Sequence, residues 1–160
     1  MKETFILRNL TKKEFDELYD AMRPIWLDTY SFLPKKQVEL LLDKYFSKQG
    51  IKHYLSIGYE YYSINGMGLL VIKEQEDSLY IDKLYIQPNF QKQGLASKVF
   101  KYLIKERKKQ LMLNVNKNNL PAVSCYLKNG FKIKKEEIIE LGNGLVNCDY
   151  VMVKEIEQRI

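Results

Sequence analysis

Residues 84–96 read LYIQPNFQKQGLA and pass from an apolar, strand-like run through a polar loop into the start of a helix. Amide groups at a helix start have no partner inside the helix, and the helix dipole adds partial positive charge there. Gly94 and Ala96 carry little bulk and Lys92 adds a full charge, so the loop suits a phosphate-bearing ligand. The Gln-x-x-Gly-x-Ala spacing alone is a weak motif, because many helix starts match it by chance.

A strand, helix, strand unit surrounds this loop. Short runs rich in Tyr, Ile, Leu and Val precede it and predict three antiparallel strands, at His53–Glu60, Ile64–Glu74 and Leu79–Gln87. Apolar residues at helical spacing follow Pro88 and predict a helix that ends near Gln110. A buried strand is expected at Leu111–Val115.

The N-terminal third predicts one strand and two helices. Thr4–Arg8 is strand-like, and Thr11 with Glu14 forms a capping-box pattern ahead of a helix that bends or ends near Pro24. Pro34 fits the start of a second helix, which is expected to stop by Gly50.

The C-terminal part predicts a helix followed by a hairpin. Asn119 and Pro121 fit a helix start, and the packing face is expected to be formed by Val123, Tyr126 and Leu127. Asn129-Gly130 predicts a left-handed stop before Phe131. The strands of the hairpin are expected at Phe131–Ile139 and Leu145–Lys154.

This element order predicts an α+β fold of three layers, α/β/α, with a mixed and mostly antiparallel sheet of about seven strands and about four helices. The chain has 160 residues, of which 46% are hydrophobic and 29% charged, and no linker-like or repeated segment. We therefore expect a single domain over residues 1–160. The start resembles no signal peptide and no run is long enough to span a membrane, so a cytoplasmic location without membrane association is expected.

The cysteines and the histidine do not indicate a metal site or a nucleophile. Cys125 and Cys148 form no zinc-type pattern and are expected to be buried reduced thiols. His53 lies in an apolar run and is expected to be structural, so no metal is predicted.

The net charge of +6 indicates an anionic partner, because basic residues crowd positions 98–109. A solvated helix face and a phosphate-bearing ligand both explain this cluster. Nucleic acid is not expected, because no aromatic-interleaved basic motif is present.

A second motif makes the loop more specific. About 25 residues after Gly94, the chain carries Asn119-x-x-Ala122-x-x-x-Tyr126 followed by Gly130-Phe131. The two motifs, in this order and after a Leu-Tyr-Ile strand end, resemble the GNAT superfamily of N-acetyltransferases. Residues 149–152, Asp-Tyr-Val-Met, are similar to a bacterial branch that includes polyamine acetyltransferase relatives. Ala96 departs from the glycine that many members carry.

The resemblance implies acetyl-CoA as the cosubstrate and a set of residues that bind it. The strand before the loop would offer backbone groups to the pantetheine arm, and the loop would hold the pyrophosphate. Asn119 would contact the pantetheine chain, although a plain helix N-cap explains it nearly as well. The residues implied in cofactor binding are Leu84, Tyr85, Ile86, Gln91, Lys92, Gln93, Gly94, Leu95, Ala96, Ser97, Asn119 and Tyr126.

Two side chains are candidates for proton transfer. An alkylammonium must lose a proton before it attacks a thioester, and Asp82 could accept it because strict alternation places Asp82 on the face of Leu84 and Ile86. An ion pair with a neighbouring lysine explains Asp82 equally well. Tyr126 matches the family position of the acid that protonates the leaving thiolate, and a core-packing tyrosine is the alternative.

The expected acceptor is the primary amine of a small molecule, possibly a polyamine. Its pocket is expected between the first two helices and the last hairpin, with Trp26, Tyr30, Tyr54, Tyr59 and Asn147 as candidate lining residues. A protein N-terminus or lysine as the acceptor, or a catalytically silent CoA-binding module, are the alternatives. The protein is expected to be a monomer or a homodimer.

Overall fold

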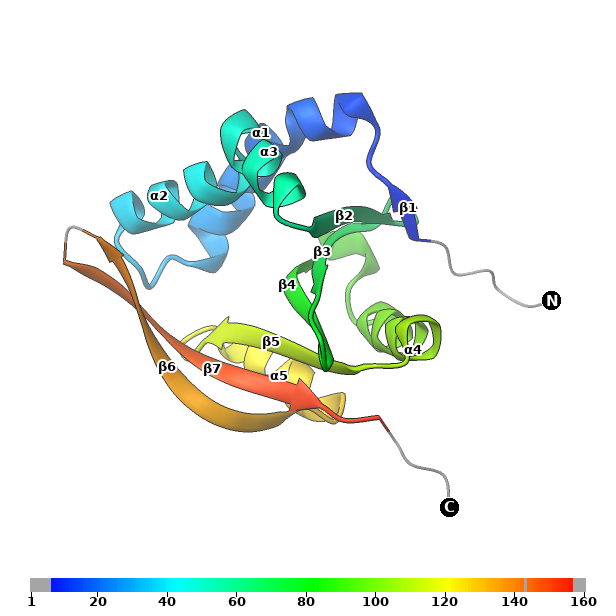
Figure 1. The fold of residues 1–160 in the computed structure, drawn as a ribbon. Coiled ribbons are helices and arrows are strands. Elements are labelled where there is room, and N and C mark those ends of the chain that lie inside the picture. The colour runs from blue at the N-terminus through cyan, green and yellow to red at the C-terminus, as the bar shows by residue number, and fades with distance from the viewer. Residues whose placement is uncertain (1–6, 143, 157–160) are drawn as a thin grey trace, which may run out of the picture.

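A computed structural model describes residues 7–142 and 144–156, which form one sheet with helices on both faces (Figure 1). The elements, in chain order, are β1 (Leu7–Asn9), α1 (Lys12–Thr29), α2 (Lys35–Phe46), α3 (Lys48–Ser56), β2 (Tyr59–Ile64), β3 (Gly68–Glu74), β4 (Ser78–Ile86), a 3₁₀ turn (Pro88–Phe90), α4 (Leu95–Arg107), β5 (Gln110–Asn116), α5 (Leu120–Lys128), β6 (Lys132–Gly142) and β7 (Leu145–Lys154).

The strand order in the sheet is β1-β2-β3-β4-β5-β7-β6. All neighbouring pairs are antiparallel except β4 and β5, which are parallel and joined through α4. The predicted mixed, mostly antiparallel sheet of seven strands is therefore confirmed. Five α-helices, rather than about four, accompany it in the described part of the chain.

Two apolar clusters lie on opposite faces of the sheet. Helices α1, α2 and α3 pack on one face, where Leu69 and Val71 of β3 point toward them. Helices α4 and α5 pack on the other face, against Leu70 and Ile72. The alternation along β3 thus divides its side chains between two cores, and the three-layer arrangement follows from it.

Helix α1 begins at the predicted capping box. The Thr11 hydroxyl accepts a hydrogen bond from the Glu14 amide, and the Glu14 carboxylate accepts one from the Thr11 amide. The helix runs through Pro24 to Thr29, so it does not end at the proline. Met22 and Trp26 on either side are buried in the α1–α3 cluster, and their packing outweighs the cost of the proline.

The strand predicted at His53–Glu60 is wrong, because Lys48–Ser56 forms helix α3. The Ser47 hydroxyl caps this helix by accepting a hydrogen bond from the Gly50 amide. Ile51 and Tyr54, three residues apart, are buried on one helical face, and His53 is exposed. Helix α2 ends at Phe46, in agreement with the prediction that it stops by Gly50. Of the predicted strand Thr4–Arg8, residues 4–6 lie outside the described residues.

The C-terminal elements follow the prediction closely. Gly130 adopts a positive φ of 88° after α5, and Phe131 is buried. Leu127, expected on the packing face, is instead 49% exposed. Cys125 is half-buried and Cys148 is exposed, so the expectation of a buried Cys148 is wrong. Asp149 takes the inward position of β7, and alternation turns Cys148 outward.

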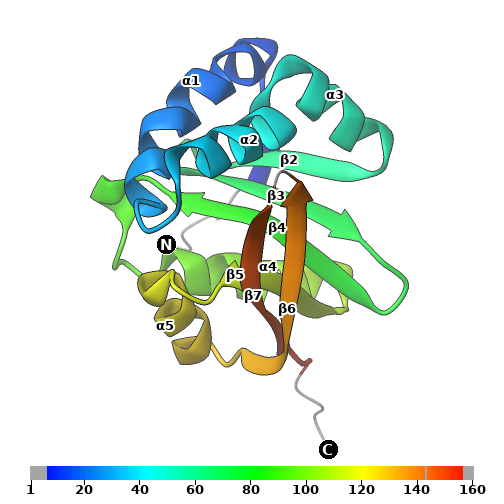
Figure 2. The same cartoon turned by 90° about the vertical axis from the view of Figure 1, so that its left-hand side faces the viewer.

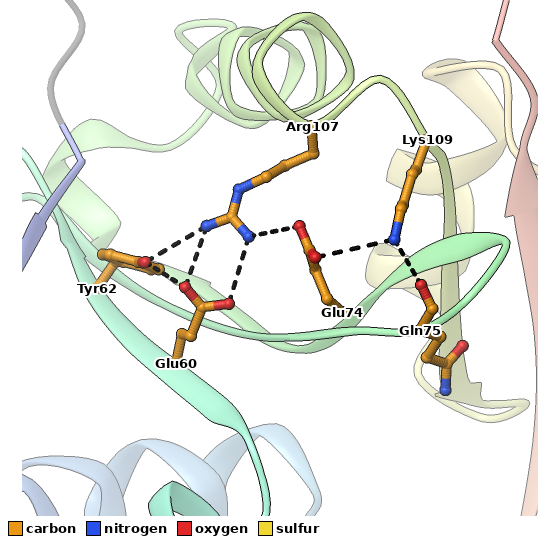
Figure 3. Close-up of polar contacts among 6 residues, drawn as sticks. All are labelled: Glu60, Tyr62, Glu74, Gln75, Arg107 and Lys109. Atoms are coloured by element: carbon orange, nitrogen blue, oxygen red, sulfur yellow. Dashed lines mark hydrogen bonds and ion pairs between the residues drawn. The ribbon is translucent and has the colours of Figure 1, made fainter.

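The C-terminal end of α4 is fixed to the sheet by ion pairs (Figure 3). The Arg107 guanidinium lies 3.1 Å from a Glu60 oxygen on β2 and 2.9 Å from a Glu74 oxygen on β3. The Tyr62 hydroxyl donates to Glu60, and Lys109 lies 3.8 Å from Glu74. These contacts pair two members of the basic cluster at positions 98–109, Arg107 and Lys109, with carboxylates. Lys101, Lys105 and Lys108 are exposed.

No helix in residues 7–142 and 144–156 is both long enough and apolar enough to cross a membrane.

The Arg107 contacts predict a pH-dependent contribution to stability. Burial raises the pKa of the Glu60 carboxyl, but the hydrogen bonds from Arg107 and Tyr62 outweigh burial and hold that pKa below its ordinary value. A lowered pKa stabilises the fold above the unfolded value of about 4.3, and the effect is lost as pH falls through the lowered pKa. Because Glu60 is partly exposed, we expect Glu60→Gln to reduce the free energy of unfolding at pH 7 by only about 1 kcal/mol.

Urea unfolding at pH 7 and pH 3 measures this effect. Glu17→Gln, which removes an exposed pair with Lys13, is the matched control and should change stability little. An equal loss from Glu60→Gln at both pH values would contradict the ionic contribution.

Candidate functional site

Strands β4 and β5 pair over only part of their length. Ser78–Ile81 pairs with Gln110–Leu113, and beyond this point the two strands diverge. Each keeps its outer neighbour, since β4 still pairs with β3 and β5 still pairs with β7. Figure 2 shows α1 and α2 on one side of this wedge and α5 with the β6–β7 hairpin on the other. The diverging ends of β4 and β5 therefore have backbone groups without a strand partner between them.

A bulge at Asp82 marks the point of divergence. Val71 of β3 faces Lys83 and Ile72 faces Ile81, so Asp82 has no partner in the register. The strict alternation that placed Asp82 on the face of Leu84 and Ile86 is interrupted here. Leu84 and Ile86 pack against the α4–α5 cluster, as Ile81 does. The bulge thus changes the phase of the strand between Ile81 and Leu84.

The wedge contains a cavity of about 220 Å³. Its walls come from α1, α2, β4, β5, the start of α5 and the β6–β7 hairpin. Of the residues predicted for an acceptor pocket, Trp26, Tyr30 and Asn147 line it. Tyr54 and Tyr59 do not, because they pack against each other with ring centroids 4.7 Å apart. Leu84 and Tyr85 also line the cavity.

The predicted anion loop ends where expected. Gly94 is the N-cap of α4 with a φ of +77°, and Lys92 also has a positive φ of 61°. No side chain caps the helix start, and a Cβ at Gly94 would meet nothing within 4 Å. The first amides of α4 therefore face open space.

The side chains of the loop have distinct positions. Gln91 and Gln93 donate hydrogen bonds to the carbonyls of Ile86 and Asn89, which hold the loop against the end of β4. Lys92 is exposed, Leu95 is buried in the core, and Ala96 and Ser97 are half-buried. In the loop and the first turn of α4, the groups suited to an anion include the Lys92 charge, the Ser97 hydroxyl and the backbone amides.

Asn119 and Tyr126 of α5 reach the opposite side of the cavity. Asn119 occupies the N-cap position, but its side chain makes no capping hydrogen bond. Tyr126 packs against Phe131, with centroids 5.5 Å apart, and also lines the cavity. Burial, with smaller contributions from Tyr30 and Cys125, raises the pKa of Tyr126 above its ordinary value. Its phenol is therefore protonated at neutral pH.

Asp82 forms an ion pair inside the cavity. Its Oδ2 lies 2.8 Å from Lys83 Nζ, and the two side chains are 11% and 14% exposed. The same Lys83 ammonium lies 3.4 Å from the centroid of the Tyr45 ring. Asp82 therefore forms the ion pair with a neighbouring lysine that is the alternative to a role as base. It also borders the cavity.

A second group of polar side chains was not predicted from the sequence. Asn114 of β5 accepts a hydrogen bond from the Tyr80 hydroxyl and donates to Glu137 and Asp149. The sequence indicates Asp149 only as part of residues 149–152, which are similar to a family ending, and it does not indicate Asn114. The alternation of buried residues along β7 is the signal that indicates an inward Asp149.

The described residues contain no group of three or more His, Cys, Asp or Glu side chains that could hold a metal ion.

Comparisons with known proteins point in one direction. Residues 15–131 match the model of the acetyltransferase (GNAT) family. No curated protein matched the chain.

Solved structures share the fold. PaiA N-acetyltransferase from Thermoplasma acidophilum, in complex with coenzyme A, is 20% identical, with 96% of this chain and 100% of that chain covered and a TM-score of 0.70. A GCN5-related N-acetyltransferase from Rhodopseudomonas palustris is 16% identical, with 98% of each chain covered and a TM-score of 0.72. Spermidine N-acetyltransferase from Vibrio cholerae, in complex with CoA and spermine, is 18% identical, with 94% and 95% covered and a TM-score of 0.62.

Proposed function

The chain belongs to the GNAT family of acetyltransferases, and on this premise we propose that it transfers an acetyl group from acetyl-CoA to the primary amine of a small molecule by direct attack. The observation that carries the proposal is the wedge between β4 and β5, which opens into a cavity reaching Tyr126. The cavity brings the backbone of β4 and β5 and a protonated phenol to one site, and the start of α4, which does not line the cavity, follows β4 in the chain.

The donor would lie along the wedge. The backbone of Leu84, Tyr85 and Ile86 would hydrogen-bond the pantetheine arm, and an amide there would stabilise negative charge on the thioester oxygen. The pyrophosphate would meet the amides of residues 91–96, with Lys92 and Ser97 beside it. Asn119 supports this placement because its side chain lines the cavity and makes no capping hydrogen bond.

Asp82 and Tyr126 would carry the proton transfers. Asp82, directly or through water, would accept a proton from the ammonium, and the free amine would attack the thioester carbonyl. The tetrahedral intermediate would then release the CoA thiolate, which takes a proton from Tyr126. The second proton of the amine nitrogen would restore the Tyr126 phenol, and the proton held by Asp82 would pass to solvent, so that one proton is released per turnover.

A small acceptor suits a cavity of this size better than a peptide does. The cavity of about 220 Å³ has aromatic walls from Trp26, Tyr30 and Tyr45. Spermine accompanies CoA in the Vibrio cholerae structure, so polyamines belong among the acceptors to test. Transfer to a protein N-terminus or lysine would need an open groove.

Acetyl-CoA binding followed by amine-dependent thiol release tests the proposal. At about 100 times its dissociation constant, acetyl-CoA should add about 2.7 kcal/mol to the free energy of unfolding. Thiol release should then require an added amine. Binding without turnover across a broad amine panel would indicate a silent CoA-binding module instead.

A pair of glycine variants tests the position of the donor in the same assay. Gly94→Ala and Gly66→Ala both place a methyl group at a positive φ, of 77° and 73°, with nothing within 4 Å. Both should therefore lose about 1–2 kcal/mol of stability. Only Gly94→Ala should weaken acetyl-CoA binding, by about tenfold or more, because only its methyl group lies beside the α4 amides. Equal acetyl-CoA affinity in the two variants would place the pyrophosphate elsewhere.

Tyr126→Phe tests the acid. The phenyl ring keeps the packing on Phe131 and removes only the hydroxyl, so we expect kcat to fall by about 10²- to 10⁴-fold with little change in acetyl-CoA affinity. Steady-state kinetics and calorimetry measure the two quantities. A parallel loss of turnover and affinity would argue for a packing role.

Asp82→Asn tests the base, with Lys83→Met as its matched control. Both variants break the ion pair, but only Lys83→Met keeps the carboxylate. We expect Asp82→Asn to lower kcat/KM at pH 7. The kcat/KM of this variant should recover as pH rises toward the amine pKa of about 10.4, where free amine is abundant. A pH–rate profile shared by the two variants would refute the role of the carboxylate.

A further inference from the structure

Asp149 is a buried carboxylate with one oxygen unused. It lies on β7, is 6% exposed and borders the cavity. Its Oδ2 accepts a hydrogen bond from Asn114 at 3.3 Å, whereas Oδ1 has no hydrogen-bond partner among the described residues. A buried carboxylate oxygen without a donor is costly, because burial removes the water that would otherwise hydrate it.

The surrounding network has no donor to spare for Oδ1. The Tyr80 hydroxyl donates to Asn114 Oδ1 at 3.0 Å, which fixes the orientation of the Asn114 amide. The two hydrogens of Asn114 Nδ2 are then used by Glu137, at 2.9 Å, and by Asp149 Oδ2. The Asp149 carboxylate is therefore held in place by one oxygen, while the other is buried without a hydrogen-bond partner among the described residues.

Lys83, the cation that acts electrostatically on Asp149, is already committed elsewhere. Lys83 pairs with Asp82 at 2.8 Å and lies over the Tyr45 ring. Asp82 and Asp149 both line the cavity, but only Asp82 is neutralised by an ion pair. A cationic group that entered the cavity would find an unsatisfied anionic oxygen at Asp149.

We propose that Asp149 binds an ammonium group of the acceptor through Oδ1, so that the acceptor is an alkylammonium compound. The inference rests on the proposed amine acetylation. An ammonium donates up to three hydrogen bonds and would supply the donor that Asp149 Oδ1 lacks. Tyr30 and Tyr80 also line the cavity, and aromatic rings favour a cation over a neutral ligand.

The electrostatics of Asp149 agree with this role. Burial raises the pKa of its carboxyl, the hydrogen bond from Asn114 opposes that effect, Glu137 adds to it, and Lys83 opposes it. An arriving ammonium would lower this pKa and favour the ionised form. Binding of the cation and ionisation of Asp149 would therefore support each other.

Calorimetric binding of hexylamine, 1,6-diaminohexane and spermidine, at pH 7.5 with and without CoA, tests the proposal. Of these amines, we consider the one that the wild type binds most tightly. We expect Asp149→Asn to weaken its binding by about 10- to 100-fold, as for loss of a hydrogen bond between charged groups. Glu137→Gln is the matched control, because it keeps an acceptor for Asn114 and does not line the cavity. It should bind the amine within about threefold of the wild type.

The outcomes separate the two proposals. If Asp149→Asn weakens the binding of 1,6-diaminohexane and spermidine only, Asp149 binds a second ammonium group of the acceptor. If it weakens the binding of hexylamine as well, Asp149 binds the reacting ammonium. Both results support the inference. Unchanged binding in Asp149→Asn, an equal loss in Glu137→Gln, or no amine binding by the wild type would overturn it. Acetyl-CoA binding, measured in the same preparations, tests the proposed function separately, and Asp149→Ser replaces Asp149→Asn should that variant fail to fold.

Discussion

The parallel pairing of β4 and β5 ends after Ile81, and the site depends on that limit. The bulge at Asp82 changes the course of β4, while β3 and β7 hold the two strands from outside. A parallel sheet that continued would have satisfied these backbone groups and filled the cavity. Divergence instead leaves polar backbone at the centre of the molecule, where a ligand can pair with it.

The same connection begins a helix beyond the diverging end of β4. Helix α4 leaves the end of β4 and returns to β5, so its N-terminal amides face the side on which the strands diverge. Leu95 and Val99 bury one face of the helix, and Arg107 fixes its far end to Glu60 and Glu74. The predicted anion loop thus precedes a helix that is held at both ends, which favours a preorganised site.

The sequence predicted the features that depend on local chemistry. The capping box at Thr11, the left-handed Gly130 and the closing hairpin each follow from residues close in the chain. Helix α3 was missed because a short run of aromatic and apolar residues fits either a strand or a helix, and burial of Ile51 and Tyr54 decided it. The pairing of Asn114 with Asp149 joins strands that are distant in sequence, and no local pattern contains it.

The bulge also gives the two carboxylates of the cavity different environments. It brings Lys83 beside Asp82, so that carboxylate is neutralised and its lysine covers the Tyr45 ring. Asp149, across the wedge on β7, receives only one neutral amide donor and keeps an unpaired oxygen. Because an unpaired buried carboxylate attracts a cation far more strongly than one already in an ion pair, the two acids are not interchangeable. One irregularity in β4 therefore both lies where the cavity begins and leaves Asp149 as the cavity carboxylate without an ion pair among the described residues.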